Sequence, residues 1–308
     1  MSTRITNAMT QRGVLSDLTT IANRLSNTQR KMSSGKDITK PSDDPIRANR
    51  AMTIRSDLEG IAQYKRNIGE AQAWQGSTET ALSNMSDITQ RVRELVVQGS
   101  NDTLGPTERQ AIAAEVDQLA EALKQEANTQ YAGRYIFAGT TDNTQPYAPG
   151  SADAYQGNSA AIARSIGPGV SVQVNVTADQ ILGSGSPTPP AAGDGKLLNT
   201  LRDIAQHLRG GTPADANALR TTDLKNLDAN LDGLSGTRAQ VGATTNRLET
   251  AASRFDQLET AAQTQLSETE DADMAQVLTD FSMQQSVYQA ALKSGANIVQ
   301  ASLLDFLR

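Results

Sequence analysis

The chain has 308 residues, with no cysteine, one histidine, and 28 basic against 34 acidic residues, for a formal net charge of −6. These counts exclude disulfides, thiolate metal sites and a cysteine nucleophile, and they lack the basic excess typical of nucleic-acid-binding proteins. Only 4% of the residues are aromatic, so we expect a core of Leu, Ile, Val, Ala and Met side chains, as in closely packed long helices.

The sequence contains no apolar run of membrane-spanning length. Its first thirty residues also lack the apolar core and the cleavage site of a secretory signal. We therefore expect neither membrane insertion nor a cleaved signal peptide. Export by a route that uses no cleaved signal stays open.

Ten prolines divide the chain, because a proline inside a helix removes a hydrogen bond and clashes with the preceding turn. Four long stretches contain no proline: 1–40, 46–105, 107–145 and 214–308. Six of the ten prolines gather between 146 and 190. That middle segment is predicted to be irregular, and the four stretches are predicted to be mainly helical.

The first stretch predicts a helix over 5–32. Its apolar residues alternate between spacings of three and four, a 3.5-residue repeat typical of a seam that faces another helix. Gly35 is expected to cap the C-terminus of this helix, and Asp44 with Pro45 is expected to begin the next one. The seam residues are Leu15, Leu18, Ala22, Leu25 and Met32, with Gln29 as the polar interruption.

Long helices are also predicted further along the chain. One runs over about 45–98, another begins after Pro106, and the C-terminal half carries apolar residues on one seam over 214–268. At about 1.5 Å per residue, a helix over 214–268 would be about 80 Å long, which favours an elongated rod. The C-terminal seam consists of Leu224, Leu227, Leu231, Leu234, Val241, Leu248, Ala252, Phe255, Ala262 and Leu266, with polar exceptions at Arg238, Thr245 and Glu259.

The two ends of the chain carry opposite charge. Residues 1–34 contain five basic and one acidic residue, whereas 268–308 contain two basic and six acidic residues. A final helix is predicted after the acidic segment SETEDAD, whose carboxylates complement a helix N-terminus. Opposite charges beside two apolar seams favour pairing of the terminal helices. The seam of the final helix consists of Leu278, Phe281, Tyr288, Leu292, Val299 and Phe306.

Between the helical halves, the period of the sequence changes. RYIFAG followed by TTDNTQPY predicts a strand, a turn and a returning strand, and SVQVNV alternates with the period of a strand. The predicted fold is therefore mainly α: an elongated rod of long coiled-coil-like helices formed by both halves of the chain, with paired terminal helices and a small β-rich insertion. The predicted domains are terminal segments 1–40 plus 268–308, a helical rod of 41–134 plus 196–267, and an insertion over 135–195.

The terminal helices are the candidate functional segments. An isolated pair with narrow apolar stripes is marginal in water, because ordering costs about 1–2 kcal/mol per residue. Such ends become fully ordered when neighbouring subunits cover their remaining apolar faces. The alternative is that both ends pack on their own molecule as ordinary coiled-coil helices. The predicted assembly interface consists of Leu15, Leu18, Leu25, Met32, Leu278, Phe281, Tyr288, Leu292, Val299 and Phe306.

Several motifs resemble the bacterial flagellins. RLSNTQRKMSSGKDITKPSDDP is similar to the flagellin N-terminal pattern, in which a helix ends at Ser-Ser-Gly and a connector leads to an acidic pair, here Asp43 and Asp44. The segment from DADMAQ to the end is similar to the flagellin C-terminal segment. GRYIFAGTTDNTQPY, VGATTNRLE and SLLDFL resemble the hook–filament junction branch of the family, and Pro41 and Pro45 depart from the usual filament connector.

The resemblance implies a structural protein outside the bacterial cell, exported unfolded through the flagellar type III apparatus with the help of an export chaperone. It implies assembly with copies of itself in a ring, between the other junction protein and flagellin. Filament flagellin is the first alternative. A coiled-coil adaptor or signalling protein that binds one partner helix is the second, and an enzyme is the least supported hypothesis because no constellation of base, nucleophile and electrophile is present.

The remaining chemical signals favour structural roles. GSGSPTPPAAGDGK, which ends at Lys196, lacks the spacing of a phosphate-binding loop and is interpreted as a linker. His207 is expected near a helix C-terminus, where a cation is favoured. The acidic pairs Asp43–Asp44 and Asp271–Asp273 are interpreted as helix caps rather than metal or acid–base sites. We predict no catalytic, cofactor-binding or metal-binding residues.

Overall fold

The fold comes from a computed structural model that describes residues 7–101, 103–150, 152–185 and 194–306. Side chains are described at residue 9 and over the same ranges from 12 to 296. The chain divides into two compact units. We call residues 1–61 with 257–308 the terminal unit and residues 62–256 the central unit.

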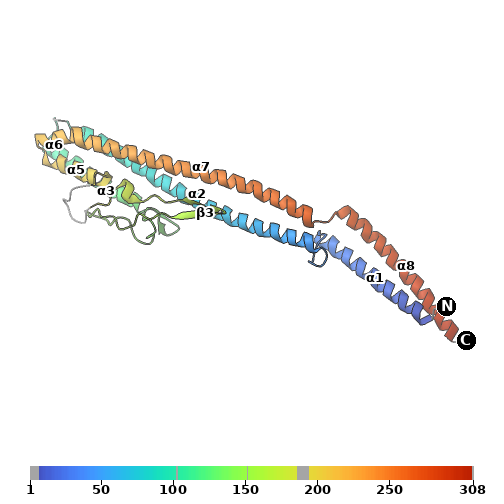
Figure 1. The fold of residues 1–308 in the computed structure, drawn as a ribbon. Helices are drawn as coiled ribbons and strands as arrows, with labels where there is room; N and C mark the ends of the chain where they lie inside the picture. Colours follow the sequence, from blue (N-terminus) through green and yellow to red (C-terminus); the bar gives the residue numbers. More distant parts are fainter. Residues whose placement is uncertain (1–6, 102, 151, 186–193, 307–308) are drawn as a thin grey trace. The chain divides into compact units, whose positions relative to one another are not determined.

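Helices make up most of the described residues, which confirms the predicted mainly α class (Figure 1). The longest are α2 and α7, of 55 and 47 residues, one from each half of the chain. The helices are α1 (Asn7–Ser34), α2 (Pro45–Gly99), α3 (Pro106–Ala127), α4 (Ala178–Ile181), α5 (Leu197–Gly210), α6 (Pro213–Ala218), the π-helical turn η1 (Leu219–Asp223), α7 (Leu224–Glu270) and α8 (Met274–Phe306).

The helix boundaries follow the predicted caps. Gly35 directly follows α1 with a φ of 69°, a conformation that glycine adopts without strain. Pro45 is the first residue of α2, where its missing N–H costs nothing. Asp44 Oδ1 accepts hydrogen bonds from the backbone N–H groups of Ile46 and Arg47, each at 3.0 Å. Asp44 is therefore the N-cap of α2, as its position before Pro45 predicts.

In the central unit, α2 and α7 run antiparallel, side by side (Figure 1). Exposed ion pairs along the shared length show this direction: Lys65–Asp256 at 2.7 Å, Arg238–Glu79 at 2.7 Å and Arg93–Asp228 at 2.7 Å. Every seventh residue of α7 is buried, which confirms a heptad seam. These residues are Leu227, Leu234, Val241, Leu248 and Phe255.

Two shorter helices, α3 and α5, add to the core of the central unit. α3 buries Val116 and Leu123, and α5 buries Leu201 and Ile204. At the end of α2, Gly99 permits a close approach, because a Cβ there would lie 2.4 Å from Leu208 Cδ2. The absence of a side chain at this position lets α5 pack directly on α2.

Among the described residues, one small antiparallel sheet lies at the start of the predicted insertion (135–195) and another lies within it. β1 (Gln130–Tyr131) pairs with β2 (Arg134–Tyr135), and β3 (Ala163–Gly167) pairs with β4 (Val170–Gln173). The strand predicted in SVQVNV is confirmed over β4. The predicted hairpin of RYIFAG with TTDNTQPY is wrong, because β2 pairs backwards with β1 through a tight turn at Ala132 and Gly133.

A buried charge cluster ties the insertion to α3 and α5. Lys124 Nζ lies 2.6 Å from Asp153 Oδ1, and Arg202 Nε lies 2.9 Å from Asp153 Oδ2. Burial alone would raise the pKa of the Asp153 carboxyl, but the hydrogen bonds from Arg202 and Lys124 hold that pKa below its ordinary value. Asp153 is therefore a charged anchor, and the cluster specifies where the insertion folds back on the helices.

The heptad seam yields a stability prediction for Leu248→Ala. Leu248 is fully buried, so its truncation is expected to lower the free energy of unfolding of the central unit by about 2–5 kcal/mol. Chemical denaturation followed by circular dichroism measures this change. Val97→Ala in the same unit is the control, because Val97 is exposed. Equal losses in the two variants would contradict the assigned seam.

Candidate assembly interface

The terminal unit joins the two ends of the chain. α1 and α8 lie side by side and antiparallel, so the start of α1 lies beside the end of α8 (Figure 1). This arrangement confirms the predicted pairing of the terminal helices. Their shared seam repeats every 3.5 residues on both helices, as a coiled coil requires. The seam positions, all partly or fully buried, are Val14, Leu18, Ile21, Leu25, Thr28 and Met32 on α1, and Val277, Phe281, Gln284, Tyr288, Ala291 and Gly295 on α8. Ala22 and Lys31 on α1 and Asp280 on α8 are also partly buried.

The seam contains polar and very small residues. Thr28 Oγ1 donates a hydrogen bond to Gln284 Oε1 at 2.9 Å across the pair. Gly295 is buried, and a Cβ at this position would lie 3.1 Å from Val14 Cγ1 and 3.6 Å from Leu18 Cδ1. A seam with a threonine, a glutamine and a glycine buries less apolar area than one built from leucines. The pair is therefore held together by only part of its apolar surface.

Five residues of the predicted interface lie in this seam, on the inner face of the pair. They are Leu18, Leu25, Met32, Phe281 and Tyr288. Three others project to solvent: Leu15, Leu278 and Leu292 are 65%, 51% and 45% exposed. The side chains of Val299 and Phe306 lie outside the described residues. The seam uses Val14 and Thr28 rather than the neighbouring Leu15 and Gln29, because adjacent pairs such as Val14–Leu15 allow two registers of the same repeat.

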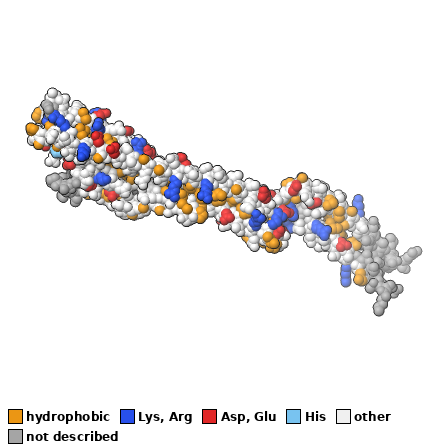
Figure 2. All heavy atoms as spheres, turned by 45° about the horizontal axis from the view of Figure 1, so that its top comes forward, with side chains coloured by type: hydrophobic (Ala, Val, Ile, Leu, Met, Phe, Trp, Pro, Cys, Tyr) orange, Lys and Arg blue, Asp and Glu red, His pale blue; other side chains and the backbone are white. Residues whose placement is uncertain are grey.

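The outer faces of the pair carry further large apolar side chains. Met283 and Val287 on α8 and Met9 on α1 are exposed in addition to the three leucines. Figure 2, in which the top of Figure 1 comes forward, shows hydrophobic side chains gathered on this part of the surface. Exposed apolar side chains of this size mark a site of association, and at about 100° per residue Leu278 and Leu292 lie on one flank of α8 and Met283 and Val287 on the other. Met283 and Val287 are not on the predicted 3.5-residue seam, and so the seam pattern missed them.

Backbone hydrogen bonds join the two connectors at the inner end of the pair. The connectors are the segment 35–44 between α1 and α2 and the segment 271–273 between α7 and α8. The amide of Asp37 donates to the carbonyl of Glu270 at 2.7 Å, and the amide of Ala272 donates to the carbonyl of Gly35 at 3.0 Å. Lys36 and Asp271 thereby form an isolated antiparallel bridge. Asp273 Oδ1 then accepts from the amide of Ala275 at 2.9 Å and caps α8, as its place at the helix start predicts.

Ion pairs reinforce these bonds. Asp37 accepts from Lys31 Nζ at 2.6 Å and from Arg47 Nη1 at 2.7 Å. Glu270, whose side chain is nearly buried, pairs with Lys36 at 2.6 Å and with Arg55. The hydrogen bonds from Lys31 and then Arg47 lower the pKa of the Asp37 carboxyl below its ordinary value. The two carboxylates thus hold α1, α2 and the two connectors in one arrangement.

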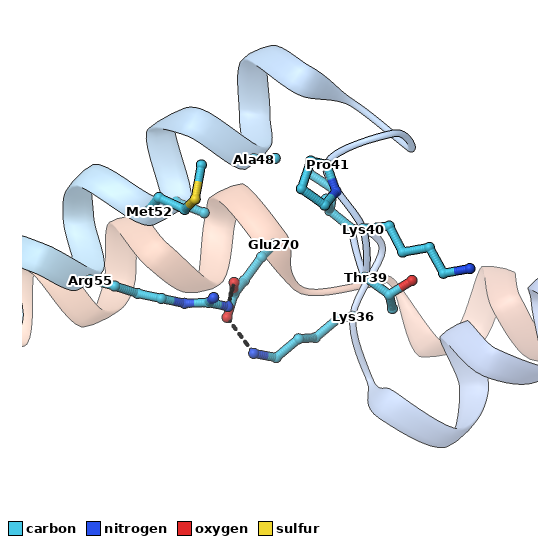
Figure 3. A pocket seen from close by; sticks show the side chains of 10 residues that line it. Lys36, Thr39, Lys40, Pro41, Ala48, Met52, Arg55 and Glu270 are labelled. Atoms are coloured by element: carbon cyan, nitrogen blue, oxygen red, sulfur yellow. Dashed lines mark hydrogen bonds and ion pairs between the residues drawn. The ribbon is translucent and has the colours of Figure 1, made fainter.

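A pocket lies beside this cluster, and Figure 3 shows its lining. Lys36 and Arg55 converge on Glu270, whereas the Lys40 side chain points away from it. The floor is apolar and buried, formed in part by Ile38, Ala48 and Ala51. We call it the basic pocket, because three of its lining residues are basic and one is acidic. The sequence analysis did not identify it, because Lys36 and Glu270 are 234 residues apart in the chain.

His207 and Lys196, which the sequence analysis considered as candidate chemical sites, lie next to helix ends. His207 lies near the end of α5, as predicted, and its Nδ1 is 2.7 Å from Asp223 Oδ2 in η1. Lys196 precedes α5, and most of the stretch before it lies outside the described residues. Among the described residues, no cluster of histidine and carboxylate side chains is arranged to hold a metal ion. In the same part of the chain, no helix combines the length and hydrophobicity needed to cross a bilayer.

Known proteins share this sequence and fold. Residues 5–142 match the bacterial flagellin N-terminal helical region, and residues 224–307 match the bacterial flagellin C-terminal helical region. Flagellar hook-associated protein 3 of Escherichia coli is 29% identical over 287 residues, which covers 89% of this chain and 90% of that protein. Flagellin FlaB1 of Treponema pallidum is 25% identical over 286 residues, with 90% of each chain covered.

A solved structure has the same arrangement of elements. Flagellar hook-associated protein 3 from Legionella pneumophila superposes with a TM-score of 0.62 at 18% identity, covering 70% of this chain and 98% of that chain. Together with the terminal pair, these matches define the class of protein: a helical structural component of the bacterial flagellum. The chain belongs to the flagellin family, because the regions that match its two helical halves span most of the sequence.

The close approach at Gly295 yields a prediction for Gly295→Leu. The added side chain meets Val14 and Leu18, and such overpacking is expected to destabilise the α1–α8 pair by about 1–3 kcal/mol. Amide hydrogen exchange of α1 in the dilute full-length protein measures this loss as faster exchange. Gly13→Leu is the matched control, since a Cβ at Gly13 has no atom within 4 Å. Equal exchange in both variants would show that Gly295 is not at the contact.

The lowered pKa of Asp37 predicts how the stability of the terminal unit changes in acid. Because its pKa is lower in the folded state, the stability it contributes is fully present above the ordinary value of 3.8 and is lost as the pH falls through the lowered pKa. The stability difference between wild type and Asp37→Asn is therefore expected to be constant near about pH 6 and to shrink toward about pH 2. Denaturation at a series of pH values checks this. A difference that grows in acid would contradict the assigned ion pairs.

Proposed function

We propose that this chain is a structural subunit that joins the flagellar hook to the filament and assembles through its paired terminal helices. The observation that carries the proposal is the outer surface of the α1–α8 pair, where Leu15, Leu278 and Leu292 remain exposed after pairing. A subunit with such a surface gains apolar burial when neighbours cover it. The match to hook-associated protein 3 over nearly the whole chain supports the junction rather than the filament.

The proposed partners follow from this role. Copies of the chain form a ring or short tier, with the other junction protein on the hook side and flagellin on the filament side. A flagellar chaperone delivers the chain to the type III apparatus, and export uses no cleaved signal peptide. Within the chain, 1–40 and 268–308 carry assembly, 41–134 with 196–267 form the helical rod, and 135–195 is a separate insertion. The chain acts by binding other subunits and carries out no catalysis.

Filament flagellin is the second candidate, because the match to flagellin FlaB1 covers the same share of the chain. The two functions differ in what the chain builds. A junction subunit stops after a tier of limited length, whereas a flagellin continues to polymerise. Cells that lack the gene are expected to show hooks without filaments in electron micrographs, and to release flagellin into the medium. Long self-seeded filaments from the purified chain would instead support filament flagellin.

The point test is Leu292→Asp, which places a charge on the exposed face of α8. Because Leu292 is 45% exposed, the free energy of unfolding of the monomer is expected to fall by only about 1 kcal/mol. Assembly on hooks is expected to fall strongly, because a carboxylate buried in a subunit contact has no partner there. Motility and electron microscopy of complemented cells measure assembly.

Ser286→Asp is the matched control for this test. It adds the same charge to an exposed position of the same helix, turned away from Leu292 by about 120°. Ser286 lies in a polar row with Thr279 and Lys293, which are spaced seven residues apart on α8. The control is therefore expected to leave both folding and assembly near wild type. If Leu292→Asp cells assemble filaments as well as the control, this face of α8 is not an assembly surface.

A further inference from the structure

Two open, shallow surfaces of opposite charge lie on the terminal unit, within residues 1–61 and 257–308. The first is the basic pocket, of about 330 Å³, in which Lys36, Lys40 and Arg55 surround an apolar floor (Figure 3). Glu270 is the acidic residue of its lining and is already paired with Lys36 and Arg55. Lys40 is exposed and makes no ion pair with the described residues. Asp43, whose Oδ2 accepts a hydrogen bond from the Lys40 amide at 2.9 Å, offsets part of the Lys40 charge. With three basic residues and one acidic residue in its lining, the pocket still presents net positive charge beside apolar surface.

The second surface is an open groove between α2 and α7, of about 670 Å³, which we call the acidic groove. Asp57 and Glu268 are its charged lining residues, and both are exposed without an ion pair to the described residues. The rest of its lining includes Ile61, Leu258 and Ala261. The groove thus combines an apolar centre with negative charge, the complement of the basic pocket.

The two surfaces face in opposite directions around α2. Ala48 and Met52 line the basic pocket, whereas Asp57 and Ile61 line the acidic groove. Each residue of the second pair follows its counterpart by nine positions, which at about 100° per residue is about half a turn. The two surfaces of one copy therefore do not meet each other. Each is open to a neighbour.

We propose that the basic pocket of one copy docks on the acidic groove of a second copy of this chain. In this contact Met52, which is 50% exposed, lies against Leu258, which is 42% exposed. Lys40 and Lys36 lie opposite Glu268 and Asp57, so opposite charges surround an apolar centre. The inference rests on the proposed function, since it identifies the side-to-side contact within a tier of subunits.

A second copy fits better than an unrelated partner because both complementary surfaces belong to the same chain. A contact of two basic pockets, or of two acidic grooves, would bring like charges together. The contact is therefore heterologous, and each added copy leaves one pocket and one groove open for the next. Repetition of this contact produces a ring or a helical tier rather than a closed dimer.

Cysteine crosslinking of the full-length chain tests the contact, since the natural sequence contains no cysteine. One preparation carries Met52→Cys and another carries Leu258→Cys. After mixing at high concentration and mild oxidation, the two preparations are expected to form a disulfide-linked dimer. Either preparation alone is expected to form about tenfold less, because the heterologous contact places unlike surfaces together. Equal crosslinking within each preparation would overturn the proposal.

Charge reversal tests whether opposite charges hold the same contact together. Lys40→Glu in the Met52→Cys copy is expected to reduce the mixed dimer about tenfold at low salt, and Glu268→Lys in the Leu258→Cys copy is expected to restore it. Lys225→Glu in the central unit, an exposed charge change away from both surfaces, is expected to have no effect.

Absence of any reduction by Lys40→Glu, or absence of rescue, would contradict the proposed charge pairing.

Failure of this contact can be distinguished from failure of the proposed function. If the crosslink fails while Leu292→Asp still blocks assembly on hooks, the junction role stands and only this contact is wrong. If Leu292→Asp assembles normally while the crosslink forms, the subunits meet through α2 and α7 and the terminal pair has another role.

Discussion

Two helices can cover only one face of each other, and this constraint governs the terminal unit. The α1–α8 seam uses several of its positions for Thr28, Gln284 and Gly295, so the buried apolar area is small for two helices of 28 and 33 residues. The remaining large apolar side chains face outward. In a monomer that surface is exposed to water, and association is the way in which it becomes buried. The incompleteness of the pair is thus the physical argument for the assembly proposed above.

In the connectors, ion pairs and backbone hydrogen bonds, rather than apolar burial, determine how the segments are arranged. Glu270 is nearly buried and paired with Lys36 and Arg55, and Asp37 is paired with Lys31 and Arg47. Buried and half-buried ion pairs add little net stability, because desolvation offsets their attraction. They do disfavour other arrangements, since a shifted register would leave Glu270 buried without a partner. The ends of the chain are therefore weakly held but held in one register.

The sequence predicted the parts of this fold that depend on local chemistry. Prolines and caps located α2 and α3 at their observed starts, and Gly35 ends α1 as expected. The sequence did not predict the features that depend on contacts between distant segments of the chain. The 3.5-residue repeat of α1 is satisfied by either Val14 or Leu15, and only the partner helix selects between them. The β1–β2 turn was missed because a two-residue strand has no period, and the basic pocket was missed because its residues meet only when distant segments fold together.

The opposite charges of the two chain ends answer a question that the apolar seam leaves open, namely why α1 pairs with an α8 rather than with another α1. A narrow seam with polar interruptions discriminates poorly between partner helices. Residues 1–34 carry an excess of basic residues, so a contact between two α1 helices is repulsive. The acidic excess of 268–308 lies mostly in the residues before α8, where Glu270 pairs with Lys36 and Arg55. Pairing of α1 with an α8 is therefore the attractive arrangement. In the assembly proposed above, the outward apolar side chains of the pair and the two charged surfaces of the terminal unit are then left for contacts with neighbours.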